Sequence, residues 1–486
     1  MALISGSTKS VQVEPFTLKE SKPKELTGQM SVTSLVLAVL AFSGPMVAVN
    51  GYMPLEITVA GTGAPFAFIL SMLSMLIFVV GYLAITKYIP KTGNFYLYVS
   101  AGLGKKAGLG SAFMAIASYI LILGNVYLFL GITFTEVVQY YFDVATPWWI
   151  WSLVGWAIVS LICHLNVEFS AKFMVIVMLL EVLFIAIFNG SILFSTERPP
   201  LEIAPLLPTS LMDGNVVMPL LFGIMLFIGL EATTVYRDEV KNPDKTIPKA
   251  TYLSIFFIGL IYTVTCYFVM AAYGKNAFDV ATNNPTGMFS DLVVSYWSTT
   301  ALEIKFALIA TSLIASLVSI NNVATRYIYG LAKDNIIPQQ LAKIHDKHES
   351  PYIASIVVQI ILVCVTVPFV MMDKPVDAIF ANMAGLGVAG IIFLMALVSV
   401  SIIIYFRRNK QFKEHIVKTT IMPVLSILIM GGNSIFIFMN LEMVIGGEKA
   451  DAWIFNLLLI AMFISGVALA LYYKIAKPHL YQKIGQ

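Results

Sequence analysis

Two carboxyl groups interrupt long apolar stretches of this sequence, and they are the side chains best suited to chemistry. Glu231 directly follows the apolar run FIGL, and Glu181 lies in AKFMVIVMLLEVLFIAIF, with no other charged residue between Phe173 and Asn189. Ionisable side chains inside membrane-spanning segments usually mark substrate or proton pathways. We therefore predict that Glu181 and Glu231 take part in proton coupling, and Glu231 could also receive an amino group. The alternatives are a permanently neutral acid at Glu181 and a structural cap of exposed amides at Glu231.

Glycine and proline mark two points at which apolar helices are expected to break. One is SGPM at 43–46, where Pro45 removes a helical hydrogen bond. The other is FIGL at 227–230, where Gly229 lowers the cost of breaking the helix. Paired interruptions in corresponding segments indicate a substrate site near the bilayer midplane of a secondary transporter. Glycine and proline are also common in membrane helices that are merely kinked.

Other polar residues in apolar segments are weaker candidates. Asn125, beside Gly124, either hydrogen-bonds substrate or joins helices. A further polar face could line a cation or substrate cavity or join helices in the same way, and it consists of Ser316, Ser319, Asn321 and Asn322. Glu136, near the outer end of its segment, is expected to be solvated.

The sequence indicates neither an enzyme nor a protein with a cofactor. It has no nucleophile–base constellation, and GLGKKAGLG at 102–110 matches neither a phosphate-binding loop nor the dinucleotide fingerprint. HDKHE at 345–349 is a weak metal signal in a charged loop, so we predict no metal site. The three cysteines lie singly in apolar runs and predict no disulfide or zinc framework. Nothing suggests nucleic-acid binding.

The composition is that of a membrane protein. Of the 486 residues, 58% are hydrophobic and 12% are charged, and the mean hydropathy is +0.85. Soluble domains carry roughly 25% charged residues. Apolar segments of about 20 residues can cross a bilayer, and they predict an all-α polytopic membrane protein with twelve transmembrane helices. The segments fall at 31–56, 65–86, 108–141, 148–165, 170–195, 217–237, 248–273, 301–332, 351–371, 376–405, 417–441 and 452–474.

The distribution of lysine and arginine predicts the orientation of the chain. With the N-terminus inside, cytoplasmic positions hold all but five of the 30 lysines and arginines. The five outside are Arg198, Lys275, Lys305, Lys374 and Lys449. We therefore expect a multi-pass protein of the inner (plasma) membrane with both termini cytoplasmic. Residues 1–30 would form the N-terminal tail and 475–486 the C-terminal tail, and the first span would act as its own insertion signal.

Three motifs resemble those of one transporter family. FIGLE at 227–231, followed by DEVKNPDKTIPKA at 238–250, resembles the sixth-span signature of the amino acid–polyamine–organocation (APC) superfamily, which begins Phe-x-Gly-x-Glu. Supporting matches are IPKTGNFYLYV at 89–99 and TRYIYGLAKDNIIP at 325–338. The resemblance covers nearly the whole chain.

The resemblance implies a fold and a mode of action. The fold would be LeuT-like, with a transport core at 31–405 made of two inverted five-helix repeats, 31–195 and 217–405, and two additional helices in 417–474. One predicted break opens each repeat, and the odd number of helices in a repeat inverts the second one. The implied function is secondary active transport of amino acids or related small amines by alternating access, commonly as proton symport.

The resemblance also assigns roles to residues. The stretch 43–47 would meet the polar head of the substrate with backbone groups, and Phe227 and Gly229 would form the facing wall. Asn125 matches a substrate-contacting Asn of arginine–agmatine exchangers of this family. Glu181 falls where relatives for cationic amino acids place a Lys that stands in for sodium, which favours proton over sodium coupling. The expected substrate-binding residues are Ser43, Gly44, Pro45, Met46, Val47, Asn125, Phe227, Gly229 and Glu231.

The first break departs from the common pattern of the family. Many members read Gly-Ser-Gly there, which gives consecutive N–H donors for a carboxylate, whereas Pro45 has no N–H. Putrescine importers of the family are more similar at this point, but they offer acidic side chains where this chain has Asn50 and Ser118. We therefore favour amino acids over polyamines. A putrescine-type importer or an exchanger of the same fold is the alternative, and a membrane sensor or channel on this fold is the alternative of a different class.

Overall fold

The computed structural model is all-helical over the residues that it describes, which confirms the predicted class. It describes residues 30–89, 95–165, 171–196, 198–211, 216–235, 237, 240–345, 351–371, 375–445 and 449–485. Within these ranges there is no strand, and one isolated bridge joins Met30 to Val240. The predicted tail 1–30, except for Met30, lies outside the described residues, as do 90–94 and 238–239 of the family motifs and 346–349 of HDKHE.

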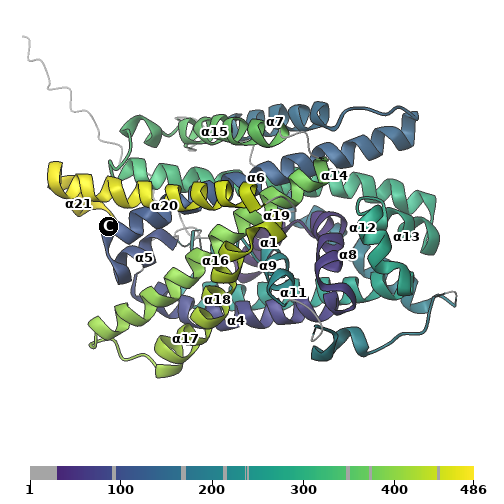
Figure 1. Ribbon diagram of the computed structural model, residues 1–486, viewed down its shortest axis with the longest axis horizontal. Coiled ribbons are helices and arrows are strands. Elements are labelled where there is room, and N and C mark those ends of the chain that lie inside the picture. Colours follow the sequence, from purple (N-terminus) through teal and green to yellow (C-terminus); the bar gives the residue numbers. More distant parts are fainter. Residues whose placement is uncertain are drawn as a thin grey trace, which may run out of the picture.

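Long apolar helices make up most of the described chain (Figure 1). The first half contains α1 (Val32–Ser43), α2 (Pro45–Val47), α3 (Met53–Ala60), α4 (Ala64–Tyr88), α5 (Phe95–Leu103), α6 (Lys105–Phe142), α7 (Trp148–Leu165), α8 (Ala171–Phe194), α9 (Val217–Met225) and α10 (Ala232–Val235). The second half contains α11 (Pro243–Tyr273), α12 (Ala277–Asn283), α13 (Met288–Tyr296), α14 (Thr299–Lys333), α15 (Tyr352–Val370), α16 (Val376–Arg408), α17 (Met422–Ser426), α18 (Gly432–Met439), α19 (Leu441–Ile445), α20 (Lys449–Ala476) and α21 (Pro478–Lys483).

Nine helical segments in the described ranges are long and apolar enough to cross a membrane. They are Val32–Tyr88, Lys105–Phe142, Ile176–Phe194, Pro243–Asn283, Thr299–Lys333, Tyr352–Val370, Val376–Arg408, Val417–Met439 and Trp453–Ala476. The helix Trp148–His164 is apolar but shorter. The chain is therefore a multi-pass membrane protein.

Helix α6 lies near the centre of the molecule and packs against α14, α16 and α20 (Figure 1). Its 38 residues span about 57 Å at 1.5 Å per residue, so α6 must tilt or project beyond a bilayer core of about 30 Å. Glycines let α16 approach it closely, because a Cβ at Gly390 would meet Ser118 Oγ at 2.1 Å. Small residues serve this purpose in membrane helix packing.

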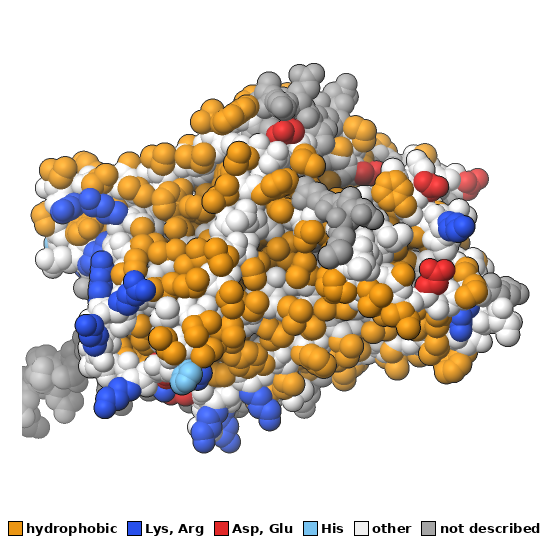
Figure 2. All heavy atoms as spheres, turned by 60° about the horizontal axis from the view of Figure 1, so that its bottom comes forward, with side chains coloured by type: hydrophobic (Ala, Val, Ile, Leu, Met, Phe, Trp, Pro, Cys, Tyr) orange, Lys and Arg blue, Asp and Glu red, His pale blue; other side chains and the backbone are white. Residues whose placement is uncertain are grey.

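Charge separates the two ends of the molecule. Figure 2 shows lysine and arginine side chains gathered at the left end and along the lower edge, acidic side chains mainly toward the right, and an apolar surface between them. The left end, hereafter the basic end, carries α5 and α21 (Figure 1). An apolar band between charged ends is the surface that a bilayer requires.

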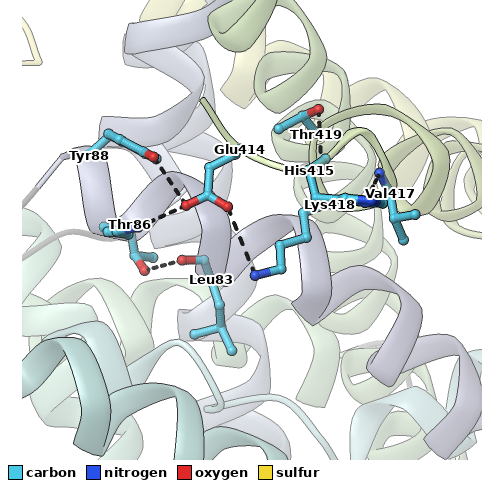
Figure 3. Close-up of polar contacts among 9 residues, drawn as sticks. Leu83, Thr86, Tyr88, Glu414, His415, Val417, Lys418 and Thr419 are labelled. Atoms are coloured by element: carbon cyan, nitrogen blue, oxygen red, sulfur yellow. Dashed lines mark hydrogen bonds and ion pairs between the residues drawn. The ribbon is translucent and has the colours of Figure 1, made fainter. Parts of the chain in front are cut away.

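At the basic end, Glu414 fixes the loop between α16 and α17 to α4 (Figure 3). Its carboxylate accepts hydrogen bonds from Lys87 Nζ at 2.9 Å and from Tyr88 OH at 3.0 Å, and Lys418 Nζ lies at 3.9 Å. The Glu414 side chain is only 12% exposed. The hydrogen bond from Lys87 holds the pKa of Glu414 below its usual range, because it stabilises the ionised carboxylate.

At the opposite end, an ion pair corrects the expectation that Glu136 is solvated. Lys305 Nζ lies 3.6 Å from Glu136 Oε1, and Ser290 Oγ bridges the two side chains at 2.8 and 2.7 Å. Lys305 is 1% exposed. Because an unpaired buried ammonium is very unfavourable, Glu136 is required there, and the three residues join α6, α13 and α14.

Both predicted helix breaks are confirmed. Helix α1 ends at Ser43, Gly44 has φ 55°, and Pro45 begins α2. Helix α9 ends at Met225, residues 226–231 form irregular turns in which Gly229 has φ 98°, and α10 follows. The breaks contact each other, since a Cβ on Gly229 would lie 2.3 Å from Phe42 Cδ1.

Replacing Gly229 by alanine should lower the free energy of unfolding by about 2–4 kcal/mol, because the left-handed φ strains a residue with a Cβ and the new methyl overlaps the Phe42 ring. The measurement is the melting temperature of the purified protein in detergent.

Gly61→Ala is the matched control. Gly61 also has a positive φ, of 55°, but a Cβ there would meet no atom within 4 Å. It should lose only about 1 kcal/mol through backbone strain. Equal losses in the two variants would contradict a tight contact between the breaks.

Stability should depend on pH through Glu414. Because the pKa of Glu414 is lowered in the folded state, its contribution to stability is fully present above the unfolded pKa of about 4.3 and is lost as pH falls through the folded pKa. Glu414→Gln should therefore lower the free energy of unfolding at pH 7 by up to about 1 kcal/mol, and this loss should shrink below about pH 4. The control is Glu303→Gln, at an exposed position. A loss of unfolding free energy in Glu414→Gln that is the same at pH 7 and below pH 4 would contradict this account.

Candidate functional site

A cavity lies between the two helix breaks. Its volume is about 20 Å³, space for about one water molecule, so the structure shows this cavity nearly closed. Four elements contribute to its wall: the first break with the turn that follows it, α6, the second break and α14. The lining residues are Phe42, Ser43, Val47, Tyr52, Ile122, Val126, Met225, Leu226, Ile228, Ser316 and Ile320.

The wall of this cavity is mainly apolar. Its polar side chains are the hydroxyls of Ser43, Tyr52 and Ser316, and no charged side chain is among the lining residues described. Ser43 Oγ is 2.6 Å from Tyr262 OH, and Ser316 Oγ donates to Ala41 O at 3.3 Å. The lining therefore combines apolar surface with three hydroxyl groups, and the helices around it would have to move apart to admit a solute larger than water.

A π-helical turn at Ala48–Tyr52 brings Tyr52 into the cavity. In an α-helix, Gly51 would follow Val47 on the same face, four residues later. The wider i→i+5 spacing instead aligns Tyr52 with Val47, while Gly51 packs against the Phe129 ring. Tyr52 was not predicted from the sequence, because π-helical turns have no reliable sequence signal.

Asn125 supports the cavity but does not line it. It is fully buried, its Oδ1 accepts from Tyr52 OH at 2.6 Å, and its Nδ2 donates to Phe380 O at 2.9 Å. Of the two roles left open by the sequence, joining helices describes this geometry. Asn125 orients the hydroxyl of Tyr52, which does line the cavity.

Glu181 binds the first helix break. Its Oε2 accepts from Met46 N at 3.3 Å and from Ser312 Oγ at 2.8 Å, so one carboxylate joins α2, α8 and α14. Its Oε1 is buried and has no hydrogen-bond partner among the described residues. Glu181 lies behind the break and does not line the cavity.

Glu231 binds the second break in a similar way. Its Oε2 accepts from Gly229 N at 3.1 Å, and its Oε1 is buried without a described partner. The side chain is 2% exposed and does not line the cavity. Each break thus has a backbone N–H bound by a buried carboxylate.

The other expected site residues fall into two groups. Ser43 and Val47 line the cavity, whereas Gly44, Pro45 and Met46 form the break beside it. At the second break, Phe227 and Gly229 are buried off the cavity, and their neighbours Met225, Leu226 and Ile228 line it. The irregular turns explain the difference, because a sequence motif does not fix which way each side chain points.

Two more buried groups were missed by sequence reasoning. Ser312 binds Glu181, and its position one turn before Ser316 on α14 was the available signal. Glu56 on α3 is fully buried, neither of its oxygens has a described partner, and it does not line the cavity. Glu56 was overlooked because it follows a proline-containing stretch near the end of its segment.

The described residues contain no group of three or more His, Cys, Asp or Glu side chains that could hold a metal ion. On α14, Asn321 joins helices, since it hydrogen-bonds Ser355 and Gln359 of α15.

The amino acid permease family model matches residues 34–486. A branched-chain amino acid permease of Bacillus subtilis is 22% identical over 315 residues, which cover 61% of this chain and 65% of that protein. A low-affinity putrescine importer of Escherichia coli is 21% identical over 438 residues, which cover 86% and 89%. An aromatic amino acid transport protein of Escherichia coli is 24% identical over 335 residues, which cover 66% and 69%.

The first of these matches spans slightly less than two thirds of the relative, whereas the second spans most of both chains. The family and these relatives are transporters and not enzymes, and the family match covers the membrane segments and both helix breaks. This chain belongs to the amino acid permease family of membrane transporters.

Proposed function

We propose that this protein is a proton-coupled permease for small neutral amino acids, working by alternating access in the inner (plasma) membrane. The observation that carries the proposal is the cavity between two helix breaks, each with a buried carboxylate on its backbone. Secondary transporters bind substrate between discontinuous helices near the bilayer midplane.

The proposed topology has twelve transmembrane helices. Val32–Tyr88 counts as two of them, and α7 and the broken segment α9–α10 add two more to the candidate spans. Residues 31–195 and 217–405 would form the inverted repeats, and 417–474 the two additional helices. The basic end would face the cytoplasm together with both termini.

The polar head of the substrate would bind at the first break. The first N–H groups of a helix have no intrahelical partner; Pro45 has no N–H, and that of Met46 is bound by Glu181. The N–H of Val47 is the next donor, and Val47 lines the cavity. We assign it, with the hydroxyls of Ser43 and Ser316, to the substrate carboxylate.

The lining favours neutral amino acids with apolar side chains over polyamines. A diamine needs a carboxylate or several acceptors at each end, because burying an unpaired ammonium is unfavourable. Glu181, Glu231 and Asn50 all lie outside the lining. The relatives that carry branched-chain and aromatic amino acids are consistent with such a substrate; the putrescine importer keeps polyamine transport as the alternative.

Glu181 is the proposed proton carrier. Hydrogen bonds to an ionised carboxylate are roughly twice as strong as those to a neutral acid. Protonation would therefore weaken the bonds from Met46 N and Ser312 Oγ, which hold α2 against α8 and α14. Proton binding would in this way loosen the junction that closes the first break.

Glu231 is proposed to shape the substrate site through the second break. Its bond to Gly229 N holds the irregular turn from which Met225, Leu226 and Ile228 face the cavity. Its free Oε1 could receive the substrate amino group or a proton when the break rearranges.

A channel or sensor on this fold is the alternative of a different class. The cavity is narrow and bounded by packed helices, which suits occlusion of a solute better than an open pore. Saturable uptake that a second substrate stimulates from the opposite side would identify a carrier and exclude a channel.

Glu181→Gln should separate exchange from accumulation. In proteoliposomes with an imposed pH gradient, amino acid accumulation should fall to background. Counterflow exchange should stay within about twofold of wild type, because glutamine imitates the protonated acid but cannot release a proton. Equal loss of both activities, or accumulation driven by a sodium gradient instead, would contradict the proton role.

Glu231→Gln should weaken substrate binding and transport in both assays by about tenfold or more, since a hydrogen bond to a charged group contributes about 1.5–3 kcal/mol. Glu56→Gln is the matched control, because Glu56 is as buried as Glu231 but has no described hydrogen bond to a helix break. Wild-type binding in Glu231→Gln would remove Glu231 from the site.

A further inference from the structure

A second cavity opens at the basic end, between α4, α11 and the loop that leads into α17. Its volume is about 270 Å³. Its lining residues are Val80, Leu83, Ala84, Thr86, Lys87, Arg237, Pro243, Asp244, Ile247, Pro248, Tyr252, Glu414 and Lys418. None of them lines the cavity between the helix breaks. Figure 3 shows Glu414 and Lys418 near Leu83 and Thr86 of α4, and all four residues line this pocket.

The charged groups of this pocket leave it positive. Lys87 and Lys418 share the single carboxylate of Glu414, at 2.9 and 3.9 Å. Arg237 pairs with Asp244 at 2.5 Å, but the arginine side chain is 9% exposed while the aspartate is 66% exposed. Three cations therefore face two carboxylates, and the exposed carboxylate is the one best screened by water. A guanidinium is also the side chain best suited to bind phosphate.

The start of α11 adds to the positive potential. Asn242, which precedes the helix, has φ 51° and makes no side-chain cap, and Pro243 and Asp244 of the first turn line the pocket. The positive end of a 31-residue helix dipole thus lies at the same wall.

The opposite wall is apolar and continues into the lipid-facing surface. Val80, Leu83 and Ile247 line the pocket beneath the charged groups. Tyr252 is 38% exposed at its edge, and Phe256, one turn further along α11, is 55% exposed. Figure 2 shows such an apolar surface bordered by lysine and arginine side chains at this end of the molecule.

We propose that this pocket binds the headgroup of an anionic membrane phospholipid. The phosphodiester would lie against Lys87, Lys418 and Arg237, and an acyl chain would follow Tyr252 and Phe256 along the outside of α11. Basic pockets between transmembrane helices at the membrane surface bind phospholipid headgroups in this way. A soluble phosphate would use the same cations but would leave the apolar wall uncovered. The ammonium of a zwitterionic lipid would compete for carboxylates that already have partners.

The test is lipid titration of the purified full-length protein in detergent, read by native mass spectrometry. Phosphatidylglycerol should bind wild type about tenfold more tightly than phosphatidylcholine or phosphatidylethanolamine, and glycerol 3-phosphate should not compete at millimolar concentration. Lys87→Gln with Lys418→Gln should remove the preference for phosphatidylglycerol. Lys418→Gln alone, at a half-exposed position, should weaken phosphatidylglycerol binding about fivefold and serves if the double variant does not fold.

Lys410→Gln is the matched control, because Lys410 is exposed in the same loop but does not line the pocket. It should bind phosphatidylglycerol as wild type does. The proposal is overturned if the three lipids bind equally, if glycerol 3-phosphate displaces phosphatidylglycerol, or if Lys410→Gln and Lys418→Gln lose the same affinity.

Discussion

In hydrocarbon, every backbone N–H and C=O must find a partner within the protein, and a helix that breaks inside the membrane leaves some of these groups unbonded. In this chain the two breaks meet that requirement with buried carboxylates. Glu181 accepts from Met46 N, and Glu231 accepts from Gly229 N. The first bond ties the first break to α8 and the second fixes the turn of the second break, and the cavity lies between these two segments.

Under the proposed function, this arrangement would connect protonation to the shape of the site. An ionised carboxylate accepts a stronger hydrogen bond from the backbone N–H of a helix break than the neutral acid does. The oxygen that each carboxylate leaves without a described partner is a place where a proton or an amino group can arrive. In the proposed mechanism, substrate and proton would therefore act on the same two backbone segments.

The sequence predicted the parts of this account that depend on residue type. Gly44, Pro45 and Gly229 marked the breaks, and the isolation of Glu181 and Glu231 in apolar runs marked the acids. It could not predict which side chains face the cavity, because that depends on backbone register. A π-helical turn places Tyr52 in the wall of the cavity, and the irregular turns of the second break place the neighbours of Phe227 there in its stead. It also missed the pairing of Glu136 with Lys305, which are far apart in the chain.

The central claim is that a substrate is held between the two breaks by an enclosed, mainly apolar wall. An experimental structure of the full-length protein with a saturating transported amino acid tests it most directly. The account predicts the ligand between Ser43–Val47 and Met225–Ile228, with its carboxylate at the N–H of Val47 and its side chain toward Ile122 and Ile320. A ligand bound elsewhere, or two continuous helices in place of the breaks, would contradict it.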